Sequence, residues 1–159
     1  MLPMHLAYMI DHVRQQGKAL MRLRRACGST TGLSRDAFSH ETYPAVQLVP
    51  PQTASFFENM VLKARSADRA KFAEILAEVQ VSDSRLTDMR ERYLEQNSSS
   101  ISIITMSQLD SFILQLADIH ARCESLFEYA RPAKSLHEPN AAAKSTALHI
   151  MGFRDHEFP

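Results

Sequence analysis

The 159-residue sequence contains little glycine, few cysteines and no excess of either charge. Its four glycines leave few places for tight turns, which favours an α-rich fold. Two cysteines, Cys27 and Cys123, do not make a disulfide framework, and we expect a reducing, cytoplasmic location. The 18 basic and 18 acidic residues cancel, which argues against a surface built as a whole for nucleic acid. A hydrophobic content of 45% suits a domain with one core.

Membrane and catalytic signatures are missing as well. No apolar run approaches the length of a transmembrane segment, and residues 1–10 lack the leading basic region of a signal peptide. The sequence contains no GxSxG motif and no Walker-type GxxxxGK[ST] motif. No glutamate stands three residues before a histidine, as the ligand pairs of di-iron bundles require. These absences argue against an enzyme and indicate no cofactor.

The clearest positive signal is the stretch 105–131. Its apolar residues recur in alternating steps of three and four, which places them on one stripe of a helix. Thr105 and Gln108 are spaced for a capping box at its start, and Pro132 ends it. We therefore expect a long amphipathic helix here.

Similar patterns predict the other helices. We expect helices at about 3–27, 55–80 and 84–96, with the second starting at a Ser55–Glu58 capping box and a turn at Ser82 to Ser84 before the third. A break at Ser66 to Asp68, which would divide the second helix in two, is the alternative. The fold class is thus all-α: a bundle of four principal helices in residues 1–131, with a long crossover loop at 28–52. Residues 132–159 form a C-terminal extension with a short docking helix at about 141–151.

The face of helix 105–131 opposite its apolar stripe carries unusually few charges. Small residues spaced four apart on this face would let a neighbouring helix approach closely. We therefore expect that this helix is the central one of the bundle, or that its second face meets another subunit. The candidate partner-binding residues on this face are Leu114, Ala117, Ala121, Ser125 and Tyr129.

The first predicted helix has a basic face. Residues 1–27 contain five basic residues and one acidic residue, Asp11. Four of the basic residues follow one another along one side of the helix and are candidate partner-binding residues: Arg14, Lys18, Arg22 and Arg25. This stripe could contact phosphates of nucleic acid, an acidic protein partner or an anionic membrane surface. A solvated face that pairs with neighbouring acidic residues is the simpler explanation, and an acidic protein partner comes next.

His120 and Cys123 stand three residues apart on one helical face, a spacing that can hold two ligands of a metal ion. No second motif supplies further ligands, so a buried histidine beside a packing cysteine is the simpler interpretation. We assign no metal ligands.

Taken together, the patterns predict a non-enzymatic helical interaction protein. It would act as an adaptor, a chaperone-like binder or an inhibitor through helix–helix surfaces, and we expect it to form homo-oligomers. A nucleic-acid-associated protein that binds phosphates through the basic face is one alternative. A metal or redox function at His120 and Cys123 is the other.

Overall fold

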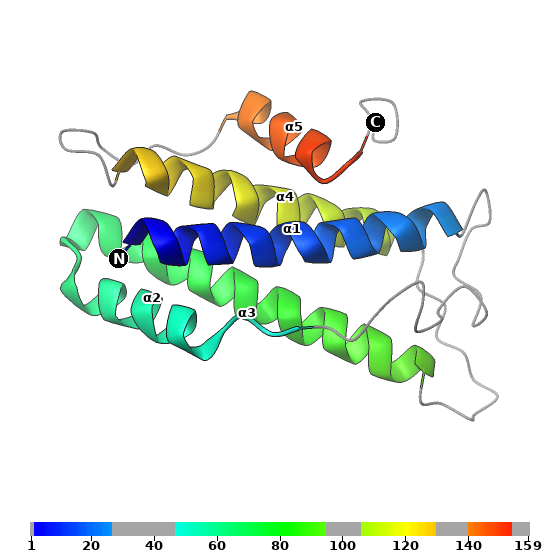
Figure 1. Cartoon of the computed structure of the whole chain (residues 1–159), viewed down its shortest axis with the longest axis horizontal. Helices are drawn as coiled ribbons and strands as arrows, with labels where there is room; N and C mark the ends of the chain where they lie inside the picture. The colour runs from blue at the N-terminus through cyan, green and yellow to red at the C-terminus, as the bar shows by residue number, and fades with distance from the viewer. Residues whose placement is uncertain (1, 27–46, 95–105, 130–139, 154–159) are drawn as a thin grey trace.

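The computed structural model describes residues 2–26, 47–94, 106–129 and 140–153, and it confirms the predicted all-α bundle (Figure 1). The helices in these ranges are α1 (Leu2–Ala26), α2 (Pro51–Lys63), α3 (Ser66–Leu94), α4 (Met106–Tyr129) and α5 (Ala141–Ile150). No strand occurs in these ranges. None of the helices described combines the length and the apolar character that a membrane crossing requires.

Helix α4 is the central helix, as the sequence indicated, because it packs against α1, α3 and α5 (Figure 1). The helices α1 and α4 run antiparallel: Arg24, near the end of α1, donates to Asp110, near the start of α4 (Nε–Oδ1 2.6 Å). The apolar stripe of α4, including Leu109, Ile113 and Leu116, is buried in the common core.

Helix α2 begins earlier than the Ser55–Glu58 capping box predicted. It starts at Pro51, and the carbonyl of Pro50 accepts hydrogen bonds from the amides of Thr53 and Ala54. Proline suits a first helical position because its missing N–H would have no partner there. The predicted 28–52 crossover falls largely on residues 27–46, which lie outside the described part of the chain.

Helix α3 contradicts two predicted boundaries. The alternative break near Ser66 is correct, because α2 ends at Lys63 and α3 begins at Ser66. The predicted turn at Ser82 to Ser84, by contrast, is wrong, and one helix of 29 residues runs through it. Ser82 and Asp83 are buried, and the Asp83 carboxylate bonds to groups outside α3 instead of capping a new helix. Two of these three polar residues thus face the interior of the bundle and do not form a turn, and Ser84 is exposed.

Helix α5 closely follows its prediction. The Asn140 side chain accepts a hydrogen bond from the Ala143 amide (2.9 Å), the contact expected of an N-cap. Gly152 ends the segment with a φ of 90°, a conformation that glycine adopts without a steric penalty. The helix docks on the bundle, chiefly on α4. The division of the chain into 1–131 and 132–159 as separate units stays a prediction.

Candidate helix-docking site

One side of α4 accepts α5. At 100° per residue, Ala117, Asp118 and Ala121 fall within one arc of about 100° on α4. The Nζ of Lys144 on α5 lies 2.6 Å from the Asp118 Oδ1, so the Asp118 edge of this arc faces α5. Ala117 and Ala121 are only 1% and 2% exposed. Asp110, which lies about 20° from Ala117 around α4, pairs with Arg24 of α1, so the other edge of the arc faces α1.

The end of α5 is anchored on α1. Met151 and Phe153 are buried, and Met151 lies against Gly17 of α1. A Cβ atom on Gly17 would lie 2.6 Å from the Met151 Sδ, which is closer than real atoms approach. The Arg25 guanidinium donates to the Gly152 carbonyl (3.1 Å). Gly17 thus provides the space in which the C-terminal anchor of α5 sits.

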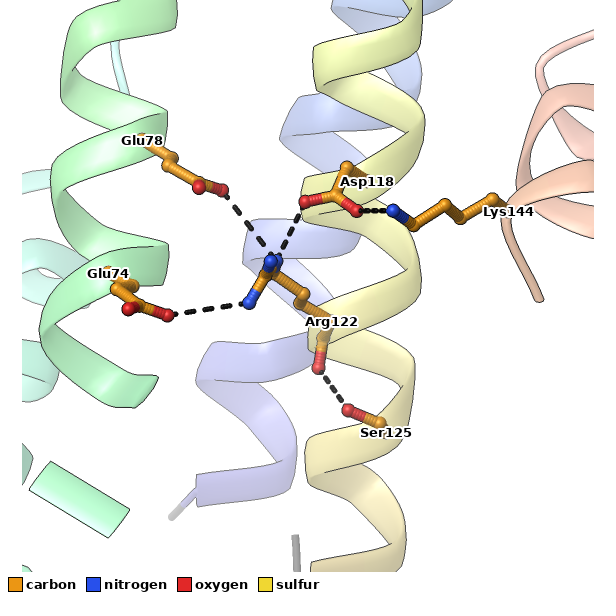
Figure 2. Close-up of polar contacts among 6 residues, drawn as sticks. All are labelled: Glu74, Glu78, Asp118, Arg122, Ser125 and Lys144. Carbon is orange, nitrogen blue, oxygen red and sulfur yellow. Dashed lines mark hydrogen bonds and ion pairs between the residues drawn. The ribbon is translucent and has the colours of Figure 1, made fainter. Parts of the chain in front are cut away.

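A charge network joins α3, α4 and α5. Figure 2 shows the Arg122 guanidinium between its helix neighbour Asp118 (Nε–Oδ2 2.7 Å) and two glutamates of α3. Its Nη1 lies 3.4 Å from the Glu74 Oε2, and its Nε lies 4.0 Å from the Glu78 Oε2. Asp118 uses its other oxygen for Lys144. Asp118 therefore contacts a cation from its own helix and a cation from α5 at once.

Two neighbouring cations lower the pKa of the Asp118 carboxyl. Burial alone raises the pKa of this carboxyl, because it disfavours the charged form. Hydrogen bonds and positive charge from Arg122 and Lys144 outweigh burial, so the pKa of Asp118 is lower than its ordinary value. The docking site is consequently charged and paired at neutral pH.

The remaining predicted residues of the second face are placed differently. Leu114 is 48% exposed, although it falls within the same arc, one turn before Ala117 and Asp118. The Ser125 hydroxyl donates to the Arg122 carbonyl of its own helix (2.8 Å). Tyr129 ends α4, and its side chain lies outside the described part of the structure. Of the four residues on this face whose side chains are described, only Ala117 and Ala121 are fully buried, and the binding of an outside partner by this face stays a prediction.

The basic residues of α1 differ in exposure. Arg25 is exposed and donates to Gly152, and Arg14 is partly buried, with its positive charge acting on His120. Arg22 is exposed, and Lys18 is partly exposed. The nucleic-acid alternative stays a prediction.

His120 and Cys123 are both buried. Burial lowers the pKa of His120; the charge of Glu124 opposes this shift and the charge of Arg14 adds to it. Neither ring nitrogen of His120 has a hydrogen-bond partner among the described residues. Burial raises the pKa of the Cys123 thiol, which disfavours the thiolate that metal binding and redox chemistry use. Among the described residues, no three potential ligands gather around a metal position.

Two parts of the docking site were missed by sequence reasoning. The Asp118–Lys144 pair joins residues 26 apart in the chain (144 − 118 = 26), so no local spacing signals it. The contact between Met151 and α1 had one signal in the sequence. Gly17 lies on the apolar face of the first predicted helix, where a glycine is unfavourable for the helix. Such a glycine indicates a close approach but does not identify the group that approaches.

Comparison with known proteins adds no assignment. No protein-family model matches the chain, and no curated protein or solved structure matches it either. The candidate site therefore has to be interpreted from its own geometry.

Proposed function

We propose that this is a non-enzymatic helical interaction protein that self-associates by exchanging α5 between two copies. The observation that carries the proposal is the docking of a ten-residue helix on α4, with Lys144 on Asp118 and Ala147 buried. A helix this short is marginal in water by itself, so its structure depends on the surface that receives it. The receiving surface and the helix are both present on every chain.

Exchange requires a connection of sufficient length. Residues 130–140 separate α4 from α5, which is eleven residues (140 − 130 + 1 = 11). Fully extended, they span up to about 36 Å at about 3.3 Å per residue.

In a reciprocal exchange each α5 meets the same contacts on the partner that it makes in its own chain. Such an exchange closes into a symmetric dimer, and no further copies are needed.

The proposal keeps the cytoplasmic location expected from the sequence. An unpaired, buried Cys123 suits a reducing compartment, where a free thiol serves as a small apolar side chain. An adaptor or inhibitor role would follow if the exchanged helix of another protein resembled α5.

The experiment uses opposite charge reversals in two full-length variants, Asp118→Lys and Lys144→Glu. Each variant alone places like charges together when α5 docks on its own chain, which costs a fraction of a kcal/mol to about 1 kcal/mol. When the two variants are mixed, reciprocal exchange restores an opposite-charge pair at both sites. The double variant Asp118→Lys/Lys144→Glu is the matched control, because it restores the pair within a single chain.

The mass is measured by light scattering behind a sizing column. We expect the mixture to contain a species of twice the 18.0 kDa chain mass, in a larger fraction than either variant or the double variant does at the same total concentration. A mixture that shows no more dimer than the double variant, up to the highest soluble concentration, would overturn the exchange of α5.

A further inference from the structure

An elongated cavity of about 320 Å³ lies between α1 and residues 47–50, apart from the α4–α5 contact. Its α1 wall extends from Tyr8 to Arg22. These residues are fourteen positions apart (22 − 8 = 14), which corresponds to about 21 Å along a helix at about 1.5 Å per residue. Gln47, Leu48 and Pro50 line it from the other segment. The cavity is therefore long and narrow, which suits a linear ligand.

The two walls are fixed to one another by buried polar contacts. The Nε2 of His12 lies 2.7 Å from the Asp83 Oδ1, and the Val49 amide donates to the Asp83 Oδ2 (2.9 Å). The Gln16 side-chain amide donates to the Gln47 carbonyl (3.1 Å). Asp83 thus links α1 to residues 47–50, because one of its carboxylate oxygens contacts each wall. A cavity with fixed walls binds its ligand with a smaller loss of conformational entropy.

The fixed contacts leave hydrogen-bonding groups for a ligand. A carboxylate only accepts hydrogen bonds, so the Nε2 of His12 carries the proton that is directed at Asp83. Its Nδ1 has no partner among the described residues and is left to hydrogen-bond a ligand. Gln15, one turn or less away on the same wall, provides a side-chain amide that both donates and accepts. A ring nitrogen and an amide side by side match the backbone groups of a peptide.

Charge and apolar surface define the ligand further. Asp11 and Arg22 both line the cavity and are eleven residues apart, or about 16.5 Å along α1. An extended chain of five residues has about the same length at about 3.3 Å per residue. Tyr8 and Leu48 are 52% and 65% exposed, which is high for large apolar side chains at the edge of a cavity.

From these groups we infer that the cavity binds a free oligopeptide of about five residues in an extended conformation. Its terminal ammonium lies at Asp11, and its terminal carboxylate lies at Arg22. His12 and Gln15 bond to its backbone, and its apolar side chains contact Tyr8 and Leu48. This inference does not depend on the exchange of α5.

The test is an NMR titration of the full-length, ¹⁵N-labelled protein with the peptide Ala-Leu-Ala-Leu-Ala. One arm uses the peptide with free termini, and the other uses the same peptide acetylated and amidated. Arg22→Gln and Asp11→Asn remove the charges that hold the termini. The matched controls are Lys18→Gln, which removes a neighbouring cation outside the cavity lining, and Glu58→Gln, which removes an exposed carboxylate on α2.

We expect the free peptide to shift the resonances of Tyr8, His12 and Leu48 and to leave those of α5 unchanged. Arg22→Gln and Asp11→Asn should each weaken binding about fivefold, the effect of one exposed ion pair, and blocking both termini removes two such pairs and should weaken binding about 25-fold. The two control variants should bind as the wild type does. Equal affinity for the free and blocked peptides, an unchanged affinity in Arg22→Gln, or no shifts up to the solubility limit of the peptide would each overturn the inference.

Discussion

The contact between Gly17 and Met151 can be tested by adding one methyl group. Replacing Gly17 with alanine improves the intrinsic helix propensity of α1 by about 1 kcal/mol. The same methyl group would lie 2.6 Å from the Met151 Sδ and 3.0 Å from its Cγ, so the methionine must move. The variant therefore combines a gain in the helix propensity of α1 with a steric clash against Met151.

The magnitudes follow from these two effects. Forcing extra volume into a packed site costs about 1–3 kcal/mol, and the flexible methionine places this case toward the lower end. We expect Gly17→Ala to change the free energy of unfolding by about 0 to 2 kcal/mol in the destabilising direction. In a Met151→Ala background the clash is absent, so the same change should stabilise the protein by about 1 kcal/mol. The coupling between the two positions is then about 1–3 kcal/mol.

The assay is urea denaturation followed by far-UV circular dichroism, because the chain has no tryptophan to report on unfolding by fluorescence. All four members of the cycle are measured: wild type, the two single variants and the double variant. If Gly17→Ala stabilises both backgrounds equally, to within about 0.5 kcal/mol, Met151 does not occupy the space at Gly17 and the docked position of α5 is wrong.

Three further predictions concern the charges and the buried faces of α4. Ala121→Arg should displace α5, because the buried position has no room for the longer side chain. Amide hydrogen exchange should then accelerate in α5 but not in α3. The exposed control Ser111→Arg should leave exchange in both helices unchanged. Because the pKa of Asp118 is lowered in the fold, its carboxylate stabilises the protein at pH values above the ordinary aspartate pKa of about 3.9. This stabilisation is lost as the pH falls below that value. Asp118→Asn should therefore make acid unfolding below about pH 4, followed by circular dichroism, less steep. Because the pKa of His120 is lowered in the fold, His120 takes up a proton when the protein unfolds below about pH 6.5. The free energy of unfolding should therefore fall by up to about 1.4 kcal/mol for each pH unit below that value. In urea titrations from about pH 7 to 5, His120→Leu should remove this slope, and the exposed control His149→Leu should retain it.

The helices that could be predicted from the sequence are those whose signals are local. The periodicity of 105–131, the cap at Asn140 and the stop at Gly152 depend on neighbours within a few residues, and α4 and α5 appear where they were expected. The start of α2 was missed because two competing local signals, Pro51 and the Ser55 box, stand close together.

The parts that could not be predicted depend on partners distant in the sequence. Asp83 looked like a turn residue because its partners, His12 and Val49, are 71 and 34 positions away. The second face of α4 was expected to be covered if the helix was central, but sequence alone could not show whether this chain or another would cover it. The position of α5 depends on long-range contacts with Asp118 and Gly17, which no local pattern in the sequence identifies.

The two oxygens of Asp118 have a consequence for a bundle from which α5 has departed. One oxygen binds Arg122, which also lies near Glu74 and Glu78, so only the bond to Lys144 is lost when the helix leaves. The carboxylate retains a cation from its own helix and is not stranded as an isolated buried charge, which is the costly outcome for a broken ion pair. Departure of α5 thus leaves Asp118 with one cation, and it loses the Lys144 ion pair, the Arg25–Gly152 hydrogen bond and the buried apolar contacts of Met151 and Phe153.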